Sequence, residues 1–143
     1  MHRLFPLALA MTVVPGMVPA QTITGIDWQL LAIDGAVVGF DIVATLRIEA
    51  DGTITGQAPC NTFGSKNQGT LPALSLGGIR ATRMACDKLA EEQAFFDALS
   101  QMTTLAPDGS SNLILTGPGW QTMEFVTDRM NSLATCKTCK PKG

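Results

Sequence analysis

The four cysteines are the residues of this chain whose chemistry follows most directly from their type and spacing: Cys60, Cys86, Cys136 and Cys139. Cysteine pairs form disulfides in exported proteins, hold zinc as thiolates, or exchange electrons through C-x-x-C motifs. A bond between Cys60 and Cys86 would close a loop of 27 residues, counting both ends. Closing a loop of that size is expected to stabilise the fold by about 3 to 4 kcal/mol.

Zinc binding and redox catalysis are the alternatives for these thiols. Four-cysteine zinc sites usually contain two pairs with two-residue spacing, and only Cys136 and Cys139, in C-K-T-C, have it. A redox-active C-x-x-C normally begins a helix after a strand, whereas this one follows the last predicted strand. For this second pair the sequence leaves three outcomes open: a small local disulfide, two free thiols or a redox motif.

Groups for acid–base catalysis are scarce. The only histidine is His2, and the chain contains no tyrosine. Histidine is the side chain that most often transfers protons near neutral pH, so Ser-His-Asp and Cys-His sites are excluded from the rest of the chain. The carboxylates fall in predicted turns or on a predicted exposed helix face, and no opposed pair is indicated. We therefore expect neither catalysis nor a cofactor or metal.

The first twenty residues have the pattern of a secretory signal peptide. His2 and Arg3 give a positive start, an apolar run follows over residues 4–14, and Ala20 supplies a small residue at the cleavage site. The apolar run is too short for a membrane anchor, and Gln21 is not the cysteine that a lipoprotein would need. We expect a periplasmic or secreted protein, cleaved near Ala20.

The remaining 123 residues (143 minus 20) suffice for one domain, which we place at residues 21–128. Removing Arg3 leaves nine basic against twelve acidic residues, a charge of −3 that gives no sign of a nucleic-acid partner. We expect a monomer. Residues 129–143 have no apolar periodicity and contain Lys137, Lys140 and Lys142, so they predict a solvated tail whose deletion from residue 130 leaves the fold intact.

Alternating side chains predict strands over most of the domain. Residues 41–50 place Ile42, Ala44, Leu46 and Ile48 on one face, and Asp51-Gly52 then provides a tight turn into residues 53–57. Further strands are expected at residues 28–33, 71–76, 79–82, 103–105, 112–116 and 120–126.

Residues 86–102 change to helical periodicity. Leu89, Phe96 and Leu99 share one face, Glu92 is expected on the solvent side, and Asp87 is a candidate N-cap. Short strands joined by turns, with one helix between two groups, predict an α+β fold that is mainly antiparallel β: a curled meander or partly open β-barrel with one packed amphipathic helix.

Four segments together resemble the META domain family of HslJ-like proteins: W-Q-L at 28–30, G-Q-A-P-C-N-T-F-G at 56–64, L-S-L-G-G-I-R-A-T-R-M-A-C at 74–86 and E-E-Q-A-F-F-D-A-L at 91–99. The resemblance covers residues 25–126 and implies a small α+β domain of the bacterial envelope, associated with stress. It supplies no catalytic residues. The motif residues to which it draws attention are Asn61, Phe63, Gly64, Thr82, Arg83 and Met84.

Each of these motif residues has a structural interpretation. Asn61 is expected to bond backbone in a turn, and Phe63 and Met84 to fill the core. Gly64, like Gly56, would serve a backbone conformation closed to larger residues. Thr82 is a candidate helix cap, and Arg83 a partner for a carboxylate. Trp28 and Trp120 are expected to contribute buried apolar area.

Three classes of function follow. The favoured one is a noncatalytic exported module that binds an envelope protein or supports the envelope under stress. The second is a carrier or sensor of an apolar small molecule held between sheet and helix, which a well-packed core would argue against. The third is a thiol-redox protein that uses Cys136 and Cys139.

Overall fold

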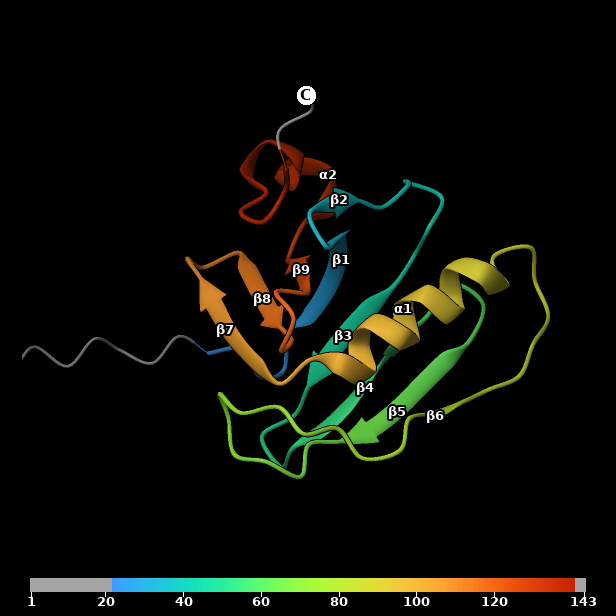
Figure 1. The fold of residues 1–143 in the computed structure, drawn as a ribbon, viewed down its shortest axis with the longest axis horizontal. Coiled ribbons are helices and arrows are strands. Elements are labelled where there is room, and N and C mark those ends of the chain that lie inside the picture. Colours follow the sequence, from blue (N-terminus) through green and yellow to red (C-terminus); the bar gives the residue numbers. More distant parts are fainter. Residues whose placement is uncertain (1–21, 141–143) are drawn as a thin grey trace, which may run out of the picture.

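The computed structural model describes residues 22–140, so the predicted signal peptide lies outside the described residues. These residues form one antiparallel sheet in the order β6-β5-β4-β3-β1-β9-β8-β7, with β2 paired to β1 (Figure 1). The strands are β1 (Asp27–Ile33), β2 (Ala36–Val37), β3 (Thr45–Ile48), β4 (Thr53–Gln57), β5 (Thr62–Lys66), β6 (Arg80–Ala81), β7 (Thr104–Asp108), β8 (Asn112–Thr116) and β9 (Thr122–Val126). The helices are α1 (Leu89–Gln101), α2 (Arg129–Ser132) and a 3-10 turn, η1 (Leu133–Thr135). The predicted α+β class is confirmed, and the sheet is curled but not closed into a barrel.

The hairpin of β3 and β4 forms as predicted, with a turn at Gly52 in the left-handed region (φ +85°). Ile42, Ala44, Leu46 and Ile48 are all buried, which confirms the expected inward face. The strand itself is shorter than expected, because residues 41–44 form the end of a loop rather than part of β3.

The segment 71–76, predicted as a strand, is instead an irregular connection. Its backbone makes isolated contacts with the start of β7: Leu74 N donates to Thr103 O at 2.8 Å, and Ala73 forms a bridge with Thr104. These contacts join the β5–β6 connection to the edge strand β7. They use single residues of the segment, so no continuous ladder forms.

In Figure 1 the helix α1 runs alongside β5, and its Phe95 and Phe96 pack against Phe63 of that strand. Its buried residues are Glu92, Phe95 and Leu99, while Leu89 is 47 % exposed. The buried face of α1 is therefore rotated by part of a turn from the predicted one. The N-cap is Lys88 rather than Asp87, and the Lys88 side chain makes no capping hydrogen bond. The actual stripe has the spacing i, i+3, i+7 that a helix needs to present one face.

The space between α1 and the sheet is filled by large side chains. The ring of Phe63 lies 5.6 Å from that of Phe95 and 5.5 Å from that of Phe96, both edge to face. Trp28 and Phe125 complete this core, and each is at most 1 % exposed. The core is packed in the way that argues against an apolar carrier.

The residues after 128 fold back onto the sheet and are not a solvated tail, so that prediction was wrong. Asp128 caps α2 through bonds from Met130 N and Asn131 N, and α2 lies against β1 near β2 (Figure 1). The guanidinium of Arg129 is buried and donates to the carbonyl oxygens of Val38, Gly39 and Ile42. The segment is thus anchored by one buried charged side chain. It has no apolar periodicity, so the sequence pattern did not predict its packing on the sheet.

Candidate functional site

The predicted Cys60–Cys86 disulfide is confirmed, with 5.7 Å between the Cα atoms. It joins the start of β5 to the residues before α1. Beside it lies a polar group that we call the signature cluster: Asn61, Thr82, the backbone of Met84, and Glu92.

Glu92 is the central residue of the signature cluster. Its carboxylate accepts hydrogen bonds from Cys60 N (2.8 Å), Asn61 N (2.9 Å) and Asn61 Nδ2 (2.6 Å). The sequence interpretation placed it toward solvent, yet it is buried. The signal that could have revealed it is its spacing: three residues before Phe95 and seven before Leu99, on the same face of α1.

Asn61 uses its amide to connect β5 with the segment before α1. Its Oδ1 accepts from Met84 N (2.6 Å) and from the Thr82 hydroxyl (2.9 Å). Thr82 in turn accepts from Thr62 N at 3.2 Å, so it braces β5 and does not cap α1. The expected backbone bonding of Asn61 is present, but its partners are 23 residues away and not in a local turn.

The remaining motif residues divide into those that the structure explains and those that it does not. Phe63 is in the core, as predicted. Met84 was expected there but is 68 % exposed, and Arg83 forms no ion pair within residues 22–140. Gly56 is required by space, because a Cβ would lie 2.1 Å from Thr45 O, whereas a Cβ at Gly64 would meet only ordinary contacts. The polar members of the cluster bond one another, which ties β5 to the segment before α1.

A second buried carboxylate, Glu124 of β9, organises the C-terminal segment. It is 0 % exposed and accepts from Asn112 Nδ2 (2.7 Å), Lys137 N (2.8 Å), Thr138 N (2.7 Å) and the Thr138 hydroxyl (2.8 Å). The segment that supplies these donors is closed by a disulfide between Cys136 and Cys139. Of the outcomes left open for that pair, the structure has the local disulfide.

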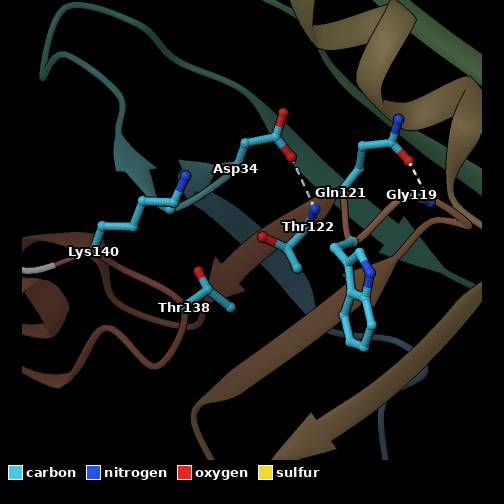
Figure 2. Close-up of a pocket in the computed structure, with 8 residues that line it drawn as sticks. Asp34, Gly119, Gln121, Thr122, Thr138 and Lys140 are labelled. Carbon is cyan, nitrogen blue, oxygen red and sulfur yellow. Dashed lines mark hydrogen bonds between the residues drawn. The ribbon is translucent and has the colours of Figure 1, made fainter.

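One of several surface features with room for a ligand is a groove of about 530 Å³ between the β1–β2 turn, the β8–β9 turn and the C-terminal segment; another, of about 440 Å³, lies at the signature cluster. We call the first the Trp120 groove; Figure 2 shows it. It is lined by Asp34, Gly35, Gly119, Trp120, Gln121, Thr122, Thr138 and Lys140.

Trp120 departs most from the sequence expectation. Its side chain is 94 % exposed and therefore contributes no buried area, in contrast to Trp28, which is 1 % exposed. Its backbone has φ +64°, a left-handed conformation that costs a residue with a side chain about 1 to 2 kcal/mol. Such strain is characteristic of binding and active sites.

Polar groups of the Trp120 groove are held in place by the surrounding backbone (Figure 2). Asp34 accepts a bond from Thr122 N at 2.9 Å. Gln121 accepts from Gly119 N at 3.1 Å and donates to Gln101 at 2.9 Å. Lys140 N donates to Gly35 O at 3.1 Å, so the C-terminal segment and the β1–β2 turn form one wall. The groove is therefore preformed.

The carboxyl groups with a clear change in acidity are ordinary surface groups. Asp41 has a lowered pKa because of its hydrogen bond to Lys88, Asp51 because of its bonds to Thr53, and Asp128 because of its bonds at the start of α2. A general acid would need a raised pKa. Within residues 22–140 there is also no group of three or more metal-binding side chains.

No helix in the described part of the chain has the length and apolar character to cross a bilayer. Searches of curated proteins give no significant match. Solved structures do match: an NMR structure of a protein from Burkholderia xenovorans, at 19 % identity and TM-score 0.59, covers 85 % of this chain and 99 % of its own. A crystal structure of a DUF4847 family protein from Bacteroides vulgatus, at 17 % identity and TM-score 0.57, covers 75 % and 95 %.

At these identities the solved structures establish the shared fold alone. The sequence profile of the META domain matches residues 21–130, which is most of the chain and includes the signature cluster and the Cys60–Cys86 bond. The Trp120 groove is formed partly by Thr138 and Lys140, which lie beyond the matched residues. The chain belongs to the META domain family.

Proposed function

We propose that this chain is an exported, noncatalytic envelope protein that binds a partner through the Trp120 groove, in a stress-related role. The observation that supports binding is Trp120 itself, 94 % exposed in a left-handed backbone conformation. An exposed indole on a strained turn costs the free protein stability and returns nothing to the core. Tryptophan is also among the residues most enriched where binding energy is concentrated.

Export is supported by the cysteines. All four cysteines are paired, Cys60 with Cys86 and Cys136 with Cys139. Structural disulfides persist in oxidising compartments such as the bacterial periplasm and are rare in the cytosol. This agrees with the predicted signal peptide at residues 1–20.

The other two functions have less support. The packed Phe63, Phe95 and Phe96 rings occupy the space in which an apolar ligand would have to lie. Cys136 Sγ lies 3.3 Å from the Glu124 carboxylate. A neighbouring negative charge disfavours the thiolate that disulfide exchange requires, so this pair is better suited to holding the C-terminal segment.

Site-specific photocrosslinking tests the proposed function. A photoreactive aromatic amino acid, which keeps a ring at the position, is placed at Trp120, and at Phe40 as a control, because Phe40 is also exposed but lies outside the groove. Each protein is exported in its own cells and irradiated there. We expect crosslinked envelope components from position 120 and not from position 40. Equal labelling at the two positions, or none at 120, would overturn the proposal.

Export has its own test. The full-length protein is recovered from cell fractions after its thiols have been blocked with an alkylating reagent. We expect it in the envelope fraction, starting near Gln21 and with all four cysteines unmodified. Recovery from the cytosol with alkylated cysteines would contradict export.

A further inference from the structure

We infer that the Trp120 groove is a site for a neutral, hydroxyl-rich glycan, such as a short oligosaccharide of hexose or N-acetylhexosamine units. The inference rests on the proposed function, since it names the chemical class of the partner that the groove would bind. It comes from the residues that line the groove and from what each can offer a ligand.

The apolar part of the groove is a single aromatic surface. Trp120 is the one large apolar side chain among the described residues that line it; the others are small or polar. A pyranose ring has an apolar face of C–H groups surrounded by hydroxyls, and such a face can lie on an exposed indole. A flat aromatic surface with a polar surround is complementary to that pattern.

The polar part of the groove can both donate and accept hydrogen bonds. Asp34 supplies carboxylate acceptors, Lys140 donors and Gln121 both, while the Thr138 hydroxyl, which donates to Glu124, can accept. Sugar hydroxyls likewise donate and accept, so a mixed lining can bond several of them. The bonds from Thr122 N to Asp34 and from Gly119 N to Gln121 fix the Asp34 and Gln121 side chains before a ligand arrives. Preorganised groups lose less conformational freedom on binding.

The charge of the lining argues against a polyanion. Asp34 and Lys140 are its only charged side chains among the described residues, so they sum to zero. Nucleic acids and anionic polymers are bound by clustered lysines and arginines. A neutral ligand suits this balance better.

The lining also argues against a protein partner. The buried centre of a protein interface is usually more apolar than the rest of the surface and contains several large side chains. The other exposed large apolar side chains lie outside the groove: Val37, Phe40, Val43, Met84, Leu89, Met130 and Leu133. A volume of about 530 Å³ is within the range of small-ligand sites.

Fluorescence quenching provides a direct test, because the two tryptophans differ so strongly in exposure. Iodide in solution reaches Trp120 and not Trp28, which is 1 % exposed. The full mature protein is titrated with chitotriose and with maltotriose, two neutral trisaccharides, and with a heparin fragment as an anionic control. We expect saturable protection of Trp120 from iodide by at least one trisaccharide and none by heparin.

Variants then locate the site, with binding measured by calorimetry so that no variant depends on its own fluorescence. Trp120→Ala is expected to weaken glycan affinity at least tenfold. Asp34→Asn keeps a side chain that tolerates the left-handed backbone at that position (φ +49°) and is expected to weaken affinity several-fold. Met84→Ala, which removes an exposed apolar side chain outside the groove, is the matched control and is expected to leave affinity unchanged. Far-ultraviolet circular dichroism confirms that each variant is folded.

The outcomes separate this inference from the proposed function. If neither trisaccharide protects Trp120, if Trp120→Ala binds as well as the wild type, or if only heparin binds, the glycan inference is wrong. If photocrosslinking at position 120 still traps a protein, the proposal that the groove binds a partner is kept, and the inference that this partner is a glycan is rejected. If crosslinking and titration both fail, the groove is not a binding site at all.

Discussion

Two buried glutamates hold this molecule together in the same chemical way, in different regions. Glu92 on α1 accepts two backbone N–H bonds from residues 60 and 61, and Glu124 on β9 accepts two from residues 137 and 138. Each also bonds the side-chain amide of an asparagine, Asn61 or Asn112, and each faces a segment that contains a disulfided cysteine.

The two regions differ in what else constrains the segment that the glutamate holds. At Glu92 the segment is covalently tied to the residues before α1 by Cys60–Cys86 and continues into β5. At Glu124 the disulfide does not tie the segment to another element, because Cys136–Cys139 closes only a local loop. We therefore expect loss of the carboxylate contacts to free the segment at Glu124 but not the segment at Glu92.

The largest effect should follow removal of residues 129–143. This takes away the Arg129 bonds to Val38, Gly39 and Ile42, and leaves Glu124 only Asn112 among its present partners. Breaking buried charged contacts of this kind typically costs about 3 to 5 kcal/mol, and we expect the upper part of that range. Chemical denaturation measures it. An unchanged denaturation midpoint would instead support the prediction from the sequence that these residues form a solvated tail.

Removing each disulfide separates covalent from noncovalent constraint. The chain-entropy relation gives about 3.5 kcal/mol for Cys60–Cys86, with 26 residues of separation, and about 2 kcal/mol for Cys136–Cys139, with a separation of 3. Paired Cys→Ser variants, compared by urea unfolding with oxidised wild type, check this order. A reversed order would mean that the Cys136–Cys139 bond contributes more to the free energy of unfolding than the length of its loop implies.

Isosteric Glu→Gln substitutions compare the carboxylates directly. In each variant one oxygen becomes an NH2 group that faces N–H donors, and we expect a loss of about 2 to 3 kcal/mol at either site. Hydrogen exchange should differ: Glu124→Gln exposes the amides of Lys137 and Thr138, whereas Glu92→Gln leaves those of Cys60 and Asn61 protected by their covalent tie. The exposed neighbour Glu91→Gln is the control, with no expected change. Equal protection of the amides near both substituted glutamates would contradict the proposed difference between the two regions.

The smallest effect is expected at the Trp120 groove, beside the region held by Glu124. Trp120→Gly should stabilise the protein by about 1 kcal/mol, because glycine adopts φ +64° without penalty and almost no buried surface is lost. Thermal unfolding measures the shift. A destabilised variant would show that the indole makes a contact that contributes to folding. Stabilisation together with loss of ligand binding would be the expected signature of a residue that serves function at the expense of stability.

The predicted parts of the fold are those in which apolar periodicity and turn chemistry act locally. Leu46 and Ile48 alternate inward and Gly52 turns the chain, so β3 and β4 could be expected from short stretches alone. The Cys60–Cys86 bond followed from the number of cysteines and the expected oxidising compartment. Of the candidate site, the sequence indicated Asn61 and Phe63 but neither Glu92 nor the Trp120 groove.

The missed parts depend on polar groups whose burial has no periodic pattern. Glu124 alternates with Met123 and Phe125, as a solvent-facing residue of a half-buried strand would, yet the C-terminal segment covers that face. In the sequence, Arg129 has the pattern of an exposed surface charge. In the fold, the 38–42 loop places three carbonyl oxygens around its guanidinium. Trp120 was predicted to be buried because tryptophan side chains usually bury most of their area.

By itself the sequence determined an α+β chain with a curled antiparallel sheet, one packed helix and a disulfide beside the C-N-T-F-G motif. These follow from hydrophobic periodicity and from covalent chemistry, which act through residue type and near neighbours. Only the tertiary structure decided that Glu92 and Glu124 are buried, that residues 129–140 pack on the sheet, and that Trp120 is exposed beside a polar groove. A buried charge is stable only where donors from distant segments converge on it, and that convergence exists only in the folded chain.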